Sequence, residues 1–436
     1  MIKYILYLLI SGLFILDWLF HVYGIGIRQM TWIPEFISII IAVLIPFRTA
    51  VTKESHLPIK YTFLLIIYIA HIGIGFLLND VSGWTMLSGV RIYTKFIPIF
   101  LVGLIFPFSE QEFKKLVLFV LLLAMIQLPV VLWQRFIAFA TSISGDPMGG
   151  TLGHSASGVL SIFLLIIISF LVAFYFKEEI SLPVFILAMA AAFIPTTLNE
   201  TKITFILLPV AFIFPAMFIK AKRKTIFRVM LVAIIFFGSF FVLKGIYDYF
   251  QQKRWGYGIQ TFITMPGRLE GYSRNRLDPI KHSFTNATKD PRFLFFGRGA
   301  GNVSEGFTKR LSGKYVQEGK YYGVSGVSFP KMIWELGIFG AVLFFLFPFF
   351  IFRDAAALSK KEGFLGAFSL GMLGFSVFFS LSILYTSTMD SNLLIYLFFM
   401  TGGYIVRQRK LYADEEEIRI QSTREKQTYI EEMSAA

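Results

Sequence analysis

The sequence of 436 residues is rich in apolar side chains and carries an excess of basic charge. Hydrophobic residues make up 56% of it, charged residues only 16%, and the formal net charge at pH 7 is +14. Soluble domains contain about 25% charged residues, so the composition excludes a soluble globular protein. The absence of cysteine excludes disulfides and thiolate metal sites, and five histidines make a histidine-rich metal centre improbable.

Twelve apolar stretches each match the length of a membrane-spanning helix. Hydrocarbon about 30 Å thick needs roughly 20 apolar residues, or somewhat fewer where a helix is short. The stretches are 4–22, 31–48, 61–78, 93–108, 115–135, 157–176, 181–198, 203–219, 226–246, 332–352, 364–384 and 391–406. The first contains Asp17 and lacks a clear cleavage site, so we expect a helix rather than a signal peptide. The sequence therefore predicts an all-α polytopic integral membrane protein.

These stretches divide the chain into four parts. Residues 1–247 hold helices 1–9, and residues 248–331 form a large polar loop. Residues 332–408 hold helices 10–12, and residues 409–436 form a charged tail that we expect to be a solvated helix or a disordered end. No internal repeat is visible.

The distribution of basic residues predicts the orientation in the membrane. If the N-terminus is cytoplasmic, the short outside loops hold only Arg28, Arg91, Lys95, Arg135 and Lys202. The inside loops and the C-terminal flank then hold seventeen: Arg48, Lys53, Lys60, Lys114, Lys115, Lys177, Lys220, Lys222, Arg223, Lys224, Arg228, Arg353, Lys360, Lys361, Arg407, Arg409 and Lys410. Because cytoplasmic loops are enriched in Lys and Arg, we expect both termini inside and the large loop outside.

The large loop is basic and contains a cluster of arginines. Lys and Arg outnumber Asp and Glu there by fourteen to six. Arg268, Arg274 and Arg276 fall within nine residues and are followed by Asp278. Planar guanidinium groups bind phosphate through paired hydrogen bonds and never lose their charge, so this segment suits a pyrophosphate. A solvated loop, or one that contacts anionic lipid head groups, is the alternative.

Alternating glycines form a second motif in the same loop, Gly297-Arg298-Gly299-Ala300-Gly301-Asn302. Glycines at alternate positions let the backbone turn sharply and approach a ligand closely. The spacing is not that of a dinucleotide fingerprint. A tight structural turn is the alternative to a ligand-binding turn.

An acidic residue, Glu335, lies about one turn into the helix where the loop re-enters the membrane. An acid at that depth is costly unless it is paired, and a cation from the loop or Lys202 is a candidate partner. The alternative is an acid near a helix start, where the helix dipole favours negative charge.

The order of these motifs resembles the O-antigen ligase/polymerase superfamily. An arginine segment, the Gly297–Asn302 motif and a helix that opens with Glu335-x-Gly337-x-x-Gly340 follow one another. Upstream, the segment 149–158, which contains His154, resembles the one that precedes a middle helix of the family. The segment 199–205 resembles the family's Ser-Arg segment, with Lys202 where Arg is usual. The resemblance covers roughly residues 145–345.

The resemblance implies a metal-independent, GT-C-like glycosyltransferase without a cofactor, in the bacterial cytoplasmic (inner) membrane. Its substrates would be an undecaprenyl-pyrophosphate-linked glycan donor and a glycan acceptor. Membrane lipids, a flippase and a chain-length regulator are candidate partners, and nucleic acid is not. Ligases carry a His about nine residues before Glu-x-Gly, where this chain has Gly326. This favours polymerisation of repeat units into O-antigen, capsule or exopolysaccharide over ligation to a lipid A core or another acceptor.

The expected roles of the site residues follow from the charge that develops during transfer. Fixed cations stabilise the departing pyrophosphate, so Arg274, Arg276 and Arg298 are the expected clamp, with Lys202 and Arg268 as additions. A base takes the proton of the acceptor hydroxyl, and the candidates are three: Glu335, Asp278 and His154. A lone histidine at the outer start of a helix, as His154 is, is more often an ordinary interfacial residue than a base.

Two other classes of function compete with this interpretation. A polysaccharide or lipid transporter typically shows ionisable residues within the membrane and two related halves. Here Asp17 and Lys244 are the main charges inside apolar stretches, both near helix ends. A non-enzymatic assembly scaffold gives no reason for arginines beside glycines.

Overall fold

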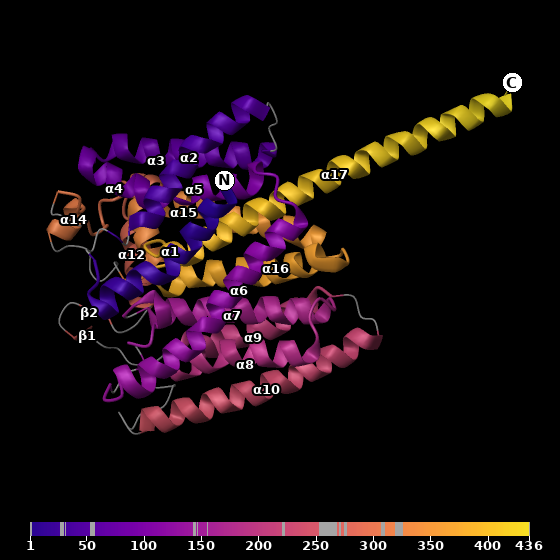
Figure 1. The fold of residues 1–436 in the computed structure, drawn as a ribbon. Coiled ribbons are helices and arrows are strands. Elements are labelled where there is room, and N and C mark those ends of the chain that lie inside the picture. Colours follow the sequence, from indigo (N-terminus) through magenta and orange to yellow (C-terminus); the bar gives the residue numbers. More distant parts are fainter. Residues whose placement is uncertain are drawn as a thin grey trace.

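The computed structural model describes residues 2–26, 30, 32–52, 57–142, 145, 147–154, 156–219, 223–252, 268–269, 272–273, 277–306, 310–318 and 326–435. This part of the chain is almost entirely helical (Figure 1). Its strands are β1 (Arg268–Leu269) and β2 (Tyr272–Ser273), an antiparallel pair in which Arg268 is opposite Ser273.

The helices of the bundle cover every one of the twelve predicted stretches. They are α1 (Ile2–Tyr23), α2 (Ile33–Thr52), α3 (Ile59–Leu78), α4 (Gly83–Thr94), α5 (Phe96–Ile105), α6 (Glu110–Trp133), α7 (Ser157–Phe176), α8 (Leu182–Leu198), α9 (Ile203–Met217), α10 (Arg223–Gln252), α15 (Ser328–Leu358), α16 (Gly363–Tyr385) and α17 (Asn392–Ala435). Shorter elements are the π-helix η2 (Gln134–Ala138), the 3-10 helix η3 (Gly150–Leu152), α12 (Leu277–Ala287), α13 (Pro291–Phe296) and α14 (Lys314–Gln317). Among the described residues, nine helical spans are long and apolar enough to cross a membrane. The prediction of a polytopic helical membrane protein is therefore confirmed, whereas the number of twelve spans stays a prediction.

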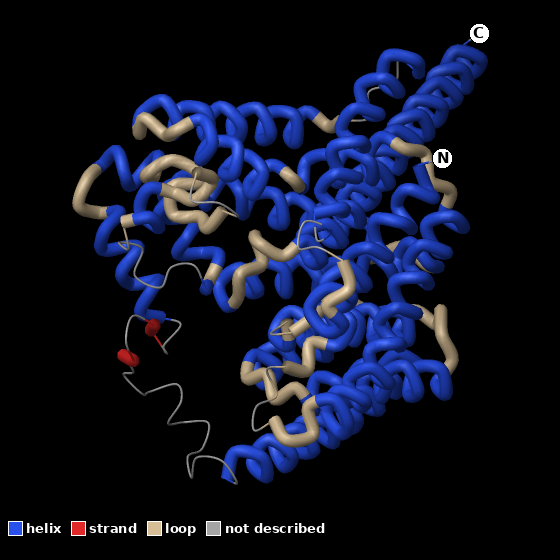
Figure 2. The backbone as a smooth tube through the Cα atoms, turned by 60° about the vertical axis from the view of Figure 1, so that its left-hand side comes forward, coloured by secondary structure: helices blue, strands red, loops and turns tan. Residues whose placement is uncertain are grey.

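The bundle has two distinct ends. α12, α14 and the two strands gather at one, which we call the loop end, and the second half of α17 projects from the other, the tail end (Figure 1). Figure 2 shows both chain termini on the side away from the strands. Lys3 pairs with Glu112 at 3.4 Å, and Arg407 Nη1 donates to Ile105 O at 2.9 Å. These contacts place the start of α1 beside the start of α6, and the end of α5 beside α17, at the tail end.

The fourth span begins about ten residues earlier than the predicted stretch 93–108. It runs from Gly83 to Ile105 as α4 and α5, which are separated at Lys95. Arg91 lowers the apolar character of this segment, so the sequence alone places the start of the helix after it, at residue 93. In the folded chain both cations have partners from other helices, and pairing makes a charge within a span tolerable.

Close backbone packing fixes the core around α5, α7 and α17. A Cβ on Gly103 would meet Met400 O, and a Cβ on Gly403 would meet Phe100 O. Small residues therefore let α5 and α17 approach, as is common between membrane helices. Nearly all of α7 is buried, so this helix forms the centre of the bundle.

Helix α15 is interrupted near the loop end. Gly337 has φ 71° and ψ 177°, which is not helical, so a short first segment precedes the rest of α15 at an angle. A Cβ at this position would meet the carbonyl of Phe295 in α13. The first segment carries Lys331 and Glu335 and lies directly beneath the large loop.

Candidate functional site

The turn Gly297–Asn302 is wedged between α3, α4 and α15. Gly297, Gly299 and Gly301 have φ values of 64°, 88° and 92°, in the left-handed region that glycine tolerates best. A Cβ on Gly297 would meet the backbone of Glu335, and one on Gly301 would meet Thr85 O. The glycines therefore permit contact with the protein's own helices. This supports the interpretation of Gly297–Asn302 as a tight structural turn rather than a ligand-binding turn.

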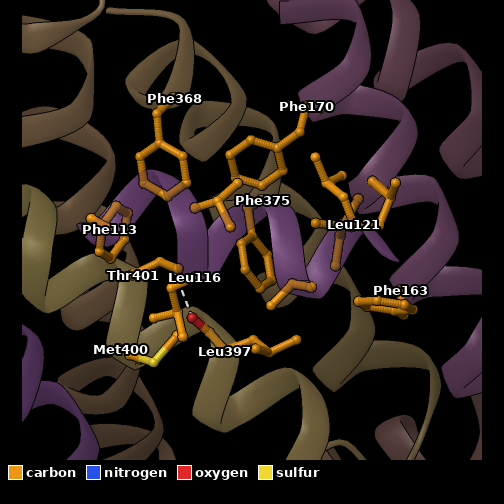
Figure 3. Close-up of a pocket in the computed structure, with 14 residues that line it drawn as sticks. Phe113, Leu116, Leu121, Phe163, Phe170, Phe368, Phe375, Leu397, Met400 and Thr401 are labelled. Carbon is orange, nitrogen blue, oxygen red and sulfur yellow. Dashed lines mark hydrogen bonds between the residues drawn. The ribbon is translucent and has the colours of Figure 1, made fainter. Parts of the chain in front are cut away.

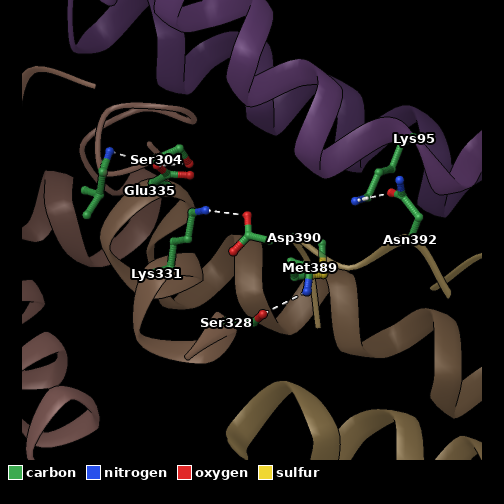
Figure 4. Close-up of polar contacts among 9 residues, drawn as sticks. Lys95, Ser304, Ser328, Lys331, Glu335, Met389, Asp390 and Asn392 are labelled. Carbon is green, nitrogen blue, oxygen red and sulfur yellow. Dashed lines mark hydrogen bonds and ion pairs between the residues drawn. The ribbon is translucent and has the colours of Figure 1, made fainter. Parts of the chain in front are cut away.

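Glu335 fastens this turn to α15. Its carboxylate is fully buried, and Oε1 accepts hydrogen bonds of 2.8 Å from Val303 N and from Ser304 Oγ (Figure 4). Tyr93 lies close enough to interact with the carboxylate. Neither its hydroxyl nor Glu335 Oε2 makes a hydrogen bond of ordinary geometry with a described residue. In this arrangement Glu335 holds the loop against α15.

Arg298 is held at the loop end by three aromatic rings. Its guanidinium carbon lies 4.0 Å from the ring centre of Phe293, 4.7 Å from that of Tyr315 and 5.1 Å from that of Trp334. Nη1 donates to Tyr315 Oη at 2.6 Å, and the backbone of Arg298 is tied to Trp334 and Asn302. Arginine has five N–H donors, and only this one is engaged by a described residue. A half-buried, immobilised guanidinium with further donors is suited to bind an anion.

An ion pair with a buried ammonium group lies beneath the loop. Lys331 Nζ is 2.7 Å from Asp390 Oδ1, and the exposed fractions of the two side chains are 4% and 37% (Figure 4). Lys331 also interacts electrostatically with Glu335, one turn further along α15. Ser328 Oγ accepts from Met389 N at 2.8 Å, and Ser328 N donates to Thr386 O at 3.1 Å. With the ion pair, three contacts join the start of α15 to the connection between α16 and α17.

A second polar group joins α2, the α4–α5 break and α17. The buried Lys95 donates through Nζ to Asn392 Oδ1 at 2.8 Å (Figure 4). Asn392 Nδ2 in turn donates to Glu35 at 3.4 Å, and Arg91 pairs with Glu35 at 3.1 Å. No sequence motif identified these residues as a site. Lys95 within a predicted span was the available signal, because charge within a membrane segment is commonly functional.

His282 is a further titratable residue that the sequence analysis missed. It lies on α12, half-exposed, with its ring stacked on that of Trp334 at 6.0 Å and its Nε2 hydrogen-bonded to the side chain of Asn286 at 2.9 Å. Partial burial lowers the pKa of His282 from its ordinary value of 6.5, and nearby Lys289 lowers it in the same direction. Both effects favour the neutral form of the imidazole. The only feature of the sequence that could have indicated this pair is the spacing of four residues between His282 and Asn286, which places them on one face of a helix.

The structure places His154 and Lys202 in a different group. His154 follows η3, is exposed and lies 5.8 Å from the ring of Phe139. Lys202 precedes α9, near a buried pair in which Arg135 Nη2 and Glu200 Oε1 are 3.2 Å apart. η3 packs on α1, α6 and α7, and α9 packs on α7, α10 and α16. These residues therefore belong to helices other than those around Arg298.

The remaining predicted residues are described only in part. Arg274 and Arg276 lie outside the described residues. Arg268 lies in β1 and Asp278 in the first turn of α12, and for both the description extends to the backbone alone. Within the described chain, no three His, Asp or Glu side chains gather closely enough to hold a metal ion.

No protein-family model matches this chain, and no curated protein matches it. The likeness to the O-antigen ligase/polymerase superfamily is thus one of short motifs and their order along the chain.

Proposed function

We propose that this protein polymerises undecaprenyl-pyrophosphate-linked oligosaccharide repeat units into O-antigen, capsule or exopolysaccharide. It would be a metal-independent, GT-C-like glycosyltransferase with twelve spans in the bacterial inner membrane. Its tail end and both termini would face the cytoplasm, and its loop end would face outward. The observation that carries the proposal is Arg298, a guanidinium immobilised at the loop end with N–H donors directed to no described residue.

The chemistry requires fixed positive charge where a pyrophosphate departs. The acceptor hydroxyl oxygen attacks the anomeric carbon of the donor sugar, the bond from that carbon to the pyrophosphate oxygen breaks, and the pyrophosphate leaves as an anion. Preorganised donors stabilise such developing charge most effectively in a poorly hydrated site. Arg298 supplies such donors at the loop end.

The proton of the acceptor hydroxyl needs a base within reach. The fully buried Glu335 holds the loop, so we propose it as a positioning residue rather than the base. His282 is half-exposed, and both it and Arg298 lie against the indole of Trp334. It joins Asp278 and His154 as a candidate, and its place beside Arg298 supports it best.

A reconstitution assay tests the proposal. Purified protein in liposomes would receive a lipid-pyrophosphate repeat unit, and the products would be separated on a gel. We expect a ladder of chain lengths from the wild type. Arg298→Ala should reduce the rate of polymerisation by about 10²- to 10³-fold, the usual effect of removing one donor to a developing anion.

A nearby arginine provides the matched control. Arg292 lies on α13, is half-exposed at its side chain and contacts Asp290 at 3.9 Å, so Arg292→Ala should keep the ladder. Equal loss of polymerisation in Arg298→Ala and Arg292→Ala would show that activity depends on the overall positive charge of the loop and not on Arg298 itself. Transfer of a single preformed chain to an acceptor lipid, with no ladder, would favour the ligase alternative.

A transporter is the second candidate, and one observation favours it. Lys95, Lys331 and Glu335 are buried within candidate spans, and such residues often mark substrate or proton pathways. The same liposomes distinguish the two functions. Movement of the lipid-linked glycan across the bilayer without elongation would support transport and overturn the polymerase.

A further inference from the structure

His71 is a buried polar side chain on α3 to which the proposed function gives no role. It is 4% exposed and lies within the candidate span Ile59–Leu78. Its Nε2 is 2.8 Å from Leu336 O in α15. Because a carbonyl oxygen only accepts, the hydrogen of this bond belongs to Nε2. Ionisable side chains within a span are costly unless they find partners, so this bond makes the imidazole tolerable at its depth.

The hydrogen bond of His71 reaches α15 where the helix is interrupted. Gly337, which has non-helical φ and ψ, directly follows Leu336. Carbonyls at the end of a helical segment need partners from outside that segment. Trp334 O accepts from Arg298 N at 2.7 Å, and Leu336 O accepts from His71. The loop turn and α3 therefore both bind carbonyls of the same short stretch of α15.

The same imidazole contacts the large loop directly. Its ring is stacked on that of Phe296, with ring centres 5.2 Å apart and an angle of 18° between the ring planes. Phe296 is the last residue of α13 and precedes Gly297. One turn further along α3, a Cβ on Gly75 would lie 3.4 Å from Phe296 O. Residues four apart share a face of a helix, so one face of α3 supports the end of α13.

Gly340 makes room for the imidazole. A Cβ on Gly340 would lie 2.6 Å from His71 Nε2, so alanine there would require the ring to move. This gives a physical account of the motif Glu335-x-Gly337-x-x-Gly340. Glu335 fastens the loop, Gly337 interrupts the helix and Gly340 admits the side chain of His71.

We propose that His71 is a positioning residue that fixes the place of Arg298 from α3. Through Leu336 O it holds the interrupted part of α15, and through Phe296 it holds the chain two residues before Arg298. It acts on the segment that carries the guanidinium without touching the guanidinium itself. Its effect on polymerisation rests on the function proposed above, whereas its effect on the position of α13 does not.

Two buried hydrogen bonds elsewhere provide matched controls. Tyr68, on the same helix, is fully buried and donates to Tyr93 O at 3.3 Å, and its ring contacts are with α5 and α15. Thr401 lies in the wall of an apolar cavity between α6, α7, α16 and α17 (Figure 3), and its Oγ1 donates to Leu397 O at 2.7 Å. Tyr68→Phe and Thr401→Val therefore each remove a buried hydrogen bond without changing a contact of the loop.

Distances between two spin labels would locate α13 in each variant. The chain has no cysteine, so labels can be attached at Arg292→Cys on α13 and at Ser181→Cys before α8, and both positions are exposed. α8 packs on α6, α7 and α10, which makes it a reference for the bundle. Double electron–electron resonance would give the distribution of distances, and thermal unfolding would confirm that each variant is folded.

We expect one narrow distribution in the wild type and in both controls. His71→Leu, which removes the donor and the ring at similar volume, should shift or broaden it. His71→Gln keeps an N–H donor of similar length and should restore most of the wild-type distribution. Gly340→Ala displaces the imidazole from the other side and should act like His71→Leu, although alanine is favourable within a helix.

A double-variant cycle in the ladder assay separates positioning from a general loss of structure. His71→Leu should lower the rate by about 10- to 100-fold, because small displacements of a stabilising group cost up to that much. Combined with Arg298→Ala, it should add no further loss, since residues that act through one another are not additive. Losses that multiply would show a general structural effect and overturn the proposal.

The spin-label distances decide the role of His71 independently of activity. Unchanged distances in folded His71→Leu would overturn the proposal, and so would an equal change in Tyr68→Phe or a broad distribution in the wild type. If His71→Leu does not fold, Gly340→Ala decides by the same criterion. A wild type that forms no ladder would overturn the polymerase and leave the distances to decide the role of His71.

Discussion

At the scale of single residues, the surroundings of Glu335 decide its role. Both donors to its Oε1 come from the large loop, Val303 N and Ser304 Oγ. The carboxylate therefore links the loop to α15 and is covered by it. A residue that contacts substrate would need an exposed atom, and Glu335 has none.

Substitution of Glu335 separates a positioning role from a catalytic one. Glu335→Gln keeps a carbonyl oxygen for the two donors, so we expect polymerisation within about tenfold of wild type. Glu335→Ala leaves two buried donors unpaired, and each costs about 1–3 kcal/mol. It should lower the unfolding temperature and abolish activity. Thermal unfolding and the ladder assay measure both effects. If Glu335→Gln were as inactive as Glu335→Ala while remaining stable, Glu335 would be the base.

At the scale of elements, the glycine turn and the kink in α15 form one packed unit. Gly297 in the turn lies against Glu335 and Gly337, and Gly337 lies against Phe295 in α13. Each left-handed glycine thus admits the backbone of another element. The loop is positioned by these contacts, and Arg298 is positioned with it.

A Cβ at Gly301 should disrupt this unit. Gly301→Ala would meet Thr85 O and place alanine at φ 92°. The left-handed conformation alone costs roughly 1–2 kcal/mol, so we expect a lower unfolding temperature and loss of the ladder. Gly73→Ala in α3 is the control, because a Cβ there meets nothing within 4 Å and alanine favours the helix by about 1 kcal/mol. Similar effects of the two variants would contradict the packing described for the turn.

At the scale of the whole molecule, the two ends differ in what they contain. The loop end carries Arg298 and the buried groups beneath it, and the tail end carries Lys114, Arg407 and the projecting part of α17. A pyrophosphate site at Arg298 would thus lie on the membrane face opposite the projecting part of α17.

Cysteine labelling tests this orientation, and the chain contains no cysteine of its own to interfere. Lys314→Cys lies at the loop end and Ser422→Cys on the projecting part of α17, and both positions are exposed. In intact cells an impermeant maleimide should label Lys314→Cys at once. It should label Ser422→Cys only after the membrane is permeabilised. Labelling of Ser422→Cys in intact cells would contradict a cytoplasmic tail end.

The sequence by itself determined where the helices lie. Lipid offers no partner to backbone N–H and C=O groups, so an apolar stretch of sufficient length is helical regardless of its neighbours. That is why a helix covers every predicted stretch. It also pointed to Arg298, because a guanidinium in a glycine-rich turn is visible locally.

Only the tertiary structure decided the start of the fourth span, the burial of Glu335, the purpose of the glycines and the place of His282. Each depends on a partner far away in the chain. Lys95 is tolerated within a span because of Asn392, 297 positions later, and His282 and Arg298 both lie against Trp334. Hydropathy is a property of a segment, whereas the pairing of polar groups is a property of the assembled bundle.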